Sequence, residues 1–244
     1  MRVYAKRSAA AAIALATGVG VSPATALDGG RSARAGDALA RASVAVGTLV
    51  DGGDRLGANR CSGVLIGPDL VMTAAHCVRA NALAATVVFF DGPRAVPAPQ
   101  AVTAVARYAV PTSDVPGEYA GSLSELSLDT AILRLRSPVR DRRPVAIARD
   151  LRPFPTRLRL AGAGLSGQGS GSLRTATLRP VLVTASGLTI ARVTDALVCK
   201  GDSGGPVVAD GRGGPVLWGV ASAIITRTPP CGDLVVIAPA VPAL

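Results

Sequence analysis

Short runs of apolar and β-branched residues, separated by glycine and proline, dominate the pattern of this 244-residue chain. In Thr130–Leu135 apolar and polar positions alternate, which is typical of a half-buried strand. No long segment has the period of an amphipathic helix. About eleven short runs at this spacing favour β-barrels over a sandwich of fewer, longer strands. The predicted strands are Ser43–Val50, Gly63–Ile66, Ala85–Phe90, Val102–Val110, Thr130–Leu135, Arg157–Ala161, Thr177–Thr184, Leu188–Val193, Gly205–Val208, Val216–Ile225 and Leu234–Ala238.

The first 26 residues differ in composition from the rest of the chain. Basic residues (Arg2, Lys6 and Arg7) precede an apolar run over 9–21, and an Ala-x-Ala sequence over 24–26 follows. This order predicts a secretory signal peptide over 1–26, and therefore a secreted or periplasmic protein. The apolar run is too short for a transmembrane helix, and no later segment approaches one, so no membrane span is expected.

The remainder, 27–244, has a length suited to one domain with a sizeable core. It contains no detectable repeat or linker, and one glycine- and serine-rich stretch, Gly162–Ser172, which predicts a long hairpin loop. The formal charge of +10 falls by three when the predicted signal peptide is removed, because that segment holds three basic residues and no acidic ones. A basic exported protein suits an anionic envelope polymer as a further candidate partner. Aromatic residues make up only 3% of the chain, so nucleic-acid binding is not expected.

The only histidine, His76, lies in the sequence TAAHC, and Ser203 lies far downstream in GDSGGP. A serine hydroxyl becomes a strong nucleophile when a base removes its proton and a third group orients that base. Imidazole is the side chain best suited to this proton transfer near neutral pH. Asp129, directly before the alternating strand, is the candidate for the third group. Other carboxylates also remain open at this point, among them Asp91, Asp114 and Asp150.

Three motifs in this order, TAAHC, DTAILRL and GDSGGP, resemble the trypsin/chymotrypsin family of serine endopeptidases. The resemblance extends from about Ala42 to about Val241. It implies an all-β fold of two packed six-stranded antiparallel β-barrels, with the active site in the cleft between them and the subdomain boundary near 140–155. The family's C-terminal helix is expected to be absent, because the chain stops at Leu244, shortly after the last predicted strand.

The resemblance also implies the catalytic roles. Ser203 would attack the scissile carbonyl, His76 would accept and return the proton, and Asp129 would orient His76. The backbone N–H groups of Gly201 and Ser203 would form the oxyanion hole. No cofactor or metal is expected.

Four cysteines allow three disulfide connectivities, and with His76 they also raise the alternative of a zinc site. The zinc alternative is disfavoured because no Cys-x-x-Cys sequence occurs and His76 already has a role. The resemblance selects the pairs Cys61–Cys77 and Cys199–Cys231. These bonds require an oxidising compartment, in agreement with export.

Cleavage after Ala26 would begin the mature chain at Leu27, which is similar to the start of active family members. The resemblance implies that this freed ammonium pairs with Asp202 and shapes the oxyanion hole. We therefore hypothesise that signal peptidase itself generates the activating terminus. Cleavage after Arg31, Arg34 or Arg41 is the alternative.

The substrate pocket aligns with three residues of this chain. Leu197 matches the pocket floor, where trypsin-like members carry an acid, so specificity for Arg or Lys is disfavoured. Ser222 and Ile224 match the pocket wall, which Ile224 would narrow. An apolar floor and a narrowed wall predict small or aliphatic residues at P1, the residue before the scissile bond.

The sequence thus predicts an exported serine endopeptidase that hydrolyses proteins or peptides through an acyl-enzyme. The alternative is a catalytically silent homologue that acts as an exported binding protein. An anion-binding envelope protein is a third hypothesis, which depends on charge alone.

Overall fold

The computed structural model describes residues 27–51, 53, 56–107, 126–148, 154–164, 171–225 and 231–240. Several predictions fall outside the described residues: the signal peptide (1–26), the middle of the glycine-rich stretch (165–170) and the last residues of the strand predicted over 102–110. The chain end (241–244), on which the expected absence of a C-terminal helix depends, also lies outside them.

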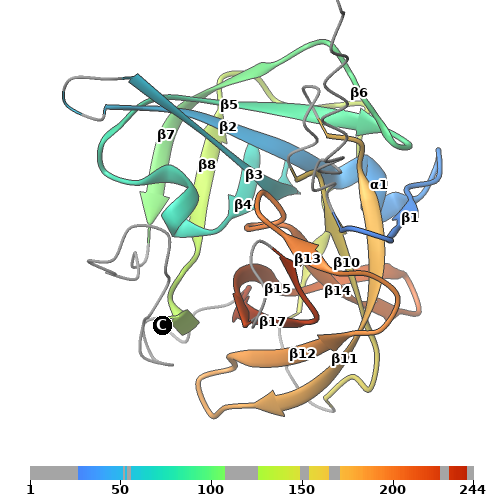
Figure 1. Cartoon of the computed structure of the whole chain (residues 1–244). Coiled ribbons are helices and arrows are strands. Elements are labelled where there is room, and N and C mark those ends of the chain that lie inside the picture. Colours follow the sequence, from blue (N-terminus) through green and yellow to red (C-terminus); the bar gives the residue numbers. More distant parts are fainter. Residues whose placement is uncertain are drawn as a thin grey trace, which may run out of the picture.

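The first barrel contains six antiparallel strands that close on themselves (Figure 1). A pairing of the second strand of the chain with the fifth completes the ring, with Val46 opposite Val87. A short strand, β6 (Arg94–Ala95), pairs with the last two residues of that fifth strand. In ring order the strands are β2 (Ser43–Asp51), β3 (Leu56–Gly67), β4 (Leu70–Thr73), β8 (Ala131–Leu135), β7 (Gln100–Arg107) and β5 (Ala82–Asp91).

The second barrel repeats this plan with six more antiparallel strands, closed by the pairing of β11 with β12. Its ring order is β10 (Leu158–Gly162), β14 (Pro206–Gly211), β15 (Gly214–Ile225), β17 (Leu234–Pro239), β12 (Thr189–Val193) and β11 (Arg174–Val183). Outside the ring, β1 (Arg31–Ser32) pairs with β11, and β9 (Ala146–Ile147) pairs with β15 in parallel. A separate ribbon joins β13 (Val198–Cys199) to β16 (Cys231–Gly232). The predicted fold of two six-stranded antiparallel barrels is confirmed.

Every predicted run overlaps a strand, but β3 is much longer than the predicted Gly63–Ile66. Its first half is rich in small and polar residues, and it is extended because it pairs with β2 along its whole length, from Ser43 opposite Val64 to Asp51 opposite Leu56. This tertiary pairing overrides a weak local preference. The short strand β4 was also not predicted.

One short helix, α1 (Ala38–Ala42), precedes β2. It begins at Asp37, whose carboxylate accepts a hydrogen bond from the Leu39 N–H at 2.8 Å. The helix is stabilised by burial of Leu39, Ala40 and Ala42 rather than by length.

The two barrels pack directly against each other. The larger core cluster combines Val44 and Val46 of the first barrel with Val208, Leu217 and Val220 of the second. A smaller cluster fills the second barrel around residues such as Leu158, Leu178 and Trp218. Segments from the two halves of the chain therefore meet at this junction, and the candidate site lies there.

Candidate active site

His76 lies on a single 3-10 turn, Ala75–Val78, that directly follows β4. Its side chain is buried, with 3% exposure. Two contacts hold this turn against the first barrel: the disulfide Cys61–Cys77 joins it to β3, and the Thr48 hydroxyl donates to the Cys77 carbonyl at 3.1 Å. The turn that carries His76 is therefore held against the first barrel by one covalent bond and one hydrogen bond, both at Cys77.

Asp129 is fully buried and stands two residues before β8. Because β4 and β8 are neighbouring antiparallel strands, with Thr73 opposite Ala131, the start of one strand meets the end of the other. The Asp129 carboxylate lies 2.8 Å from His76 Nδ1 and accepts the His76 backbone N–H at 3.0 Å. This arrangement places the hydrogen on Nδ1 and leaves Nε2 as a proton acceptor.

Ser222 reaches the same carboxylate from β15 of the other barrel. Its buried hydroxyl donates to Asp129 Oδ2 at 2.6 Å. The sequence assigned Ser222 to the wall of the substrate pocket and not to this contact. The Ser222 hydroxyl is therefore engaged by Asp129.

Ser203 is half-buried and lies in the connection between β13 and β14. Its carbonyl accepts the Ser62 N–H at 2.7 Å. The next residue, Gly204, has φ of +78°, and a Cβ there would lie 2.1 Å from Thr73 Oγ1 and 2.3 Å from the Ser62 carbonyl oxygen. Only glycine permits this approach. The structure thereby brings the Ser203 segment against the residues that lead into the His76 turn.

Gly201, two residues before Ser203, is also in the left-handed region, with φ of +92°. Two features shape this segment: the disulfide Cys199–Cys231 anchors its start, and the Asp202 N–H donates to the Cys199 carbonyl at 3.1 Å. The glycine adopts at little cost a conformation that a Cβ would resist.

Asp202 is a fully buried carboxylate. It accepts N–H groups of Leu27 and Cys199, each at 2.9 Å, and of Gly164 at 3.3 Å. Burial nevertheless raises the pKa of Asp202 to about 7, because the lost hydration of the charged form outweighs the three hydrogen bonds. Among the residues that the structure describes, no ion pair reaches Asp202, and Leu27 offers it an ordinary peptide N–H.

The remaining residues assigned to the substrate pocket lie on different elements. Leu197 has 40% of its surface exposed, and its N–H donates to the Asp28 carbonyl at 2.8 Å, beside the N-terminal segment. Ile224 is partly buried on β15 and packs against the core cluster of the second barrel. Leu197 is therefore the apolar side chain of the predicted pocket that is most available for contact.

The two disulfides also bear on the zinc alternative. The side-chain donor atoms of Cys61, His76 and Cys77 lie within 4.8 Å of one another. The two sulfur atoms are bonded to each other, so neither is a thiolate ligand. This group of residues does not fit a zinc ion.

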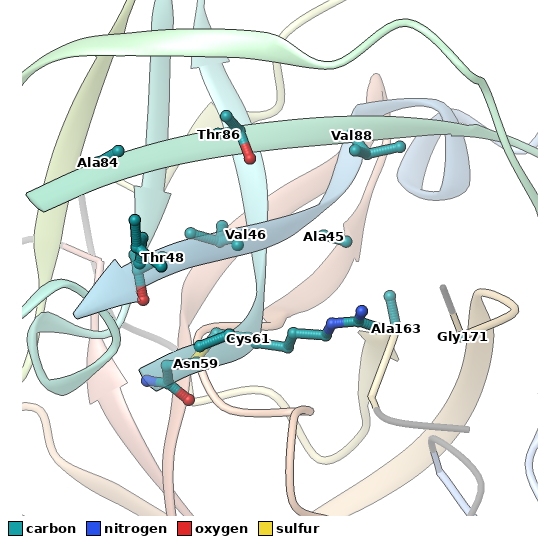
Figure 2. Close-up of a pocket in the computed structure, with 14 residues that line it drawn as sticks. Ala45, Val46, Thr48, Asn59, Cys61, Ala84, Thr86, Val88, Ala163 and Gly171 are labelled. Atoms are coloured by element: carbon teal, nitrogen blue, oxygen red, sulfur yellow. The ribbon is translucent and has the colours of Figure 1, made fainter. Parts of the chain in front are cut away.

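A cavity of about 400 Å³ lies between the first barrel and the second (Figure 2). One wall consists of small side chains on β2 and β5, such as Ala45 and Thr86, and Ala163 and Gly171 of the second barrel face it. The cavity extends to Cys61, the residue before Ser62, so it borders the segment that contacts Ser203.

The residues of this site lie within a stretch of the chain that matches the model of a known protein family. The trypsin family model matches residues 27–237, which include His76, Asp129 and Ser203. The chain belongs to the trypsin family. Members of this family are serine endopeptidases, which are hydrolases, so the suspected family and enzyme class are confirmed.

Two solved structures of trypsin-like proteins share the fold. A structure of HL collagenase has 18% sequence identity and a TM-score of 0.66, and the match covers 87% of this chain and 93% of that one. Mouse neuropsin, described as a serine protease expressed in the limbic system of the brain, has 22% identity and a TM-score of 0.58, with 85% and 93% covered. No similar sequence was found among curated proteins. Within the described part of this trypsin-family chain, no helix has the length and apolar character needed to cross a membrane.

Proposed function

We propose that this trypsin-family chain is an exported serine endopeptidase in which Ser203, His76 and Asp129 form the catalytic triad. The observation that carries the proposal is the buried His76–Asp129 pair, held by two hydrogen bonds and placed against the Ser203 segment. An orienting carboxylate, a base whose Nε2 accepts a proton and a nearby serine are the components that acyl transfer requires.

The reaction follows from these groups. The Ser203 oxygen bonds to the scissile carbonyl carbon while its proton moves to His76 Nε2. The carbonyl oxygen becomes an oxyanion, which accepts hydrogen bonds from the Gly201 and Ser203 N–H groups. When the carbon–nitrogen bond breaks, His76 returns the proton to the leaving amine. Water, deprotonated by His76, then hydrolyses the acyl-enzyme and releases Ser203.

Asp129 stabilises the imidazolium that forms in both steps. Its two oxygens are each engaged, one by the His76 backbone and the other by Nδ1 and the Ser222 hydroxyl. A carboxylate held on all these sides keeps one orientation, which preserves the tautomer that His76 needs.

Processing after Ala26 would place a charged terminus beside Asp202. The Leu27 nitrogen is already 2.9 Å from the Asp202 carboxylate, and Leu27 has φ of +38°, an unfavourable angle for a bulky residue. That angle exists only while residue 26 is attached, so cleavage relieves the strain and supplies an ammonium to the buried carboxylate. We therefore assign 1–26 as the secretory signal peptide and 27–244 as the peptidase domain, secreted or periplasmic.

Retention of residue 26 is expected to make stability fall with increasing pH. A buried Asp202 with a pKa of about 7 binds its proton more tightly than the unfolded chain does, for which the value is 3.8. Its contribution is fully present below pH 3.8 and is lost as the pH rises to about 7, by about 4 kcal/mol in total. Denaturant unfolding of chains 26–244 and 27–244 between pH 4 and 8 measures this difference.

The processed chain provides the comparison, because its ammonium offsets the charge on Asp202. The gap between the two stability curves should widen from pH 4 to 7 and should disappear in the Asp202→Asn background. Parallel curves would contradict the pairing. Intact mass of the secreted protein tests the cleavage site, and a mature start beyond Leu27 would exclude Leu27 as the activating terminus.

The specificity proposed here is for small or aliphatic P1 residues. Leu197 is the apolar residue at the predicted pocket floor and is substantially exposed, and Ile224 lies on the predicted wall. A cationic P1 side chain would lose its hydration there without gaining a charged partner. The substrate is a protein or peptide, and binding to an anionic envelope polymer stays a prediction based on charge.

A library of peptides that vary only at P1 tests both the activity and the specificity. We expect cleavage after Ala, Val or Leu to exceed cleavage after Arg or Lys by at least about 100-fold in kcat/KM, the size of effect expected when a charge is buried unpaired. The Leu197→Asp variant should shift the preference toward Arg and Lys. Preferential cleavage after Arg by the unmodified chain would contradict the pocket assignment, and no cleavage of any member would favour the silent binding homologue.

A further inference from the structure

One serine outside the predicted triad contacts both residues that would form the oxyanion hole. Ser62 is almost fully buried on β3, directly after Cys61. Its backbone N–H donates to the Ser203 carbonyl at 2.7 Å, and its hydroxyl donates to the Gly201 carbonyl at 2.9 Å. The same hydroxyl oxygen accepts the Ala163 N–H at 2.9 Å.

We propose that Ser62 is a positioning residue that holds the two amides of the oxyanion hole in their working geometry. The inference rests on the proposed function, since it concerns the same site. Ser62 is not predicted to touch substrate. Its role is to connect the first barrel to the loop of the second barrel that carries Gly201 and Ser203.

The loop needs such a support because Gly201 is free to rotate. With φ of +92° and no Cβ, this residue has other accessible conformations in which its N–H would turn away from the substrate carbonyl. The Gly201 N–H and carbonyl flank the same Cα. A hydrogen bond that fixes the carbonyl therefore restrains one of the two backbone torsions of Gly201, which reduces the number of ways in which its N–H can turn away. Amides stabilise an oxyanion most when they are oriented before the charge forms.

The Ser62 contact complements the support that Asp202 provides. The consecutive amides of Ala163 and Gly164 donate to the Ser62 hydroxyl and to the Asp202 carboxylate, respectively. The Asp202 carboxylate also accepts the Leu27 nitrogen. Ser62 of the first barrel thus holds the loop at Gly201, and the Leu27 nitrogen holds it at Asp202.

The hydroxyl of Ser62 is specifically required by this geometry. An alanine at this position would leave the buried Ala163 N–H and Gly201 carbonyl without their partner, and such groups are costly to leave unpaired. The backbone contact from position 62 to Ser203 would remain. The variant therefore releases one side of the oxyanion hole without removing any group that takes part in the chemistry.

The test compares Ser62→Ala with the unmodified, processed chain. We expect kcat for a peptide anilide to fall by about 10- to 100-fold, less than when an oxyanion donor is removed outright, with KM changed by less than about twofold. Affinity for a peptide aldehyde, whose adduct with Ser203 places an oxygen in the oxyanion hole, should fall by the same factor. Affinity for the matching peptide alcohol, which forms no adduct, should not change.

Thr189→Val is the matched control for lost stability. The Thr189 hydroxyl is fully buried, accepts the Trp218 Nε1–H at 3.0 Å and donates to the Gly187 carbonyl at 3.3 Å. Its loss removes one accepted and one donated hydrogen bond on β12, outside the loop that carries Gly201, so Tm should fall while kcat is retained. If Ser62→Ala does not fold, Ser62→Gly leaves space for a water molecule between the two unpaired groups and should still show a lower kcat.

The outcomes separate this inference from the proposed function. Unchanged kcat in a folded Ser62→Ala or Ser62→Gly variant, beside an active parent chain, overturns the inference alone. Equal losses of aldehyde and alcohol affinity also overturn it, because they would indicate general damage to the site. An inactive parent chain overturns the proposed function and this inference with it.

Discussion

Replacement of Ser203 by alanine is expected to lower kcat about a millionfold, because the Ser203 hydroxyl is the group that forms the acyl-enzyme. His76→Ala should cause a loss of similar size, and the double variant should lose little more, since the two residues act as one unit. Steady-state assays with an activated ester and a peptide anilide measure kcat of each variant.

Ser186→Ala is the control for this prediction. Ser186 lies exposed in the turn between β11 and β12, where its hydroxyl contacts only the nearby Thr184 hydroxyl at 2.9 Å among the described contacts. Its activity should equal that of the parent chain. A loss below tenfold in Ser203→Ala, or losses in the single variants that multiply in the double variant, would contradict a shared catalytic role.

Asp129→Asn is expected to lower kcat about ten-thousandfold with little change in KM. The asparagine amide keeps the shape of the carboxylate but offers one acceptor oxygen where Asp129 now meets three donors: the His76 N–H, Nδ1–H and the Ser222 hydroxyl. The amide NH₂ would favour the His76 tautomer with its hydrogen on Nε2, which cannot accept the Ser203 proton.

Steady-state kinetics together with thermal unfolding test this second prediction. Tm should change little while kcat falls about ten-thousandfold, because the asparagine side chain has almost the same volume as the aspartate side chain. Normal kcat in Asp129→Asn would show that another carboxylate orients His76. A loss of folding that accounts for the loss of activity would likewise contradict the assigned role.

Local sequence patterns predicted most of the strands, while the resemblance to the trypsin family predicted their arrangement in two six-stranded barrels and the pairing of His76 with Asp129. The alternation in Thr130–Leu135 marks a strand, and the short motifs mark the residues next to it. The strand β3 was underestimated because small and polar residues such as Gly57 and Asn59 have little β preference of their own. They are extended because they pair with β2, and this pairing is not visible in the local sequence.

The contacts of Ser62 and Ser222 could not be predicted because each joins the two barrels. Ser62 is separated from Gly201 by 139 positions, and Ser222 from Asp129 by 93. Neither residue lies within a motif that indicates its hydrogen-bond partner, and serine is common at turns and on exposed faces. The signal that was available is their near-complete burial, which appears only once the barrels are packed and which requires a hydrogen-bond partner.

Fluorophosphonate labelling of the secreted, processed chain tests the central claim most directly. The reagent phosphonylates a serine that a neighbouring base has activated, and the serine oxygen displaces fluoride. Mass spectrometry should show one adduct per chain, located on Ser203, and no adduct in Ser203→Ala or His76→Ala. A folded chain that begins at Leu27, contains both disulfides and yet remains unlabelled would contradict the proposed triad.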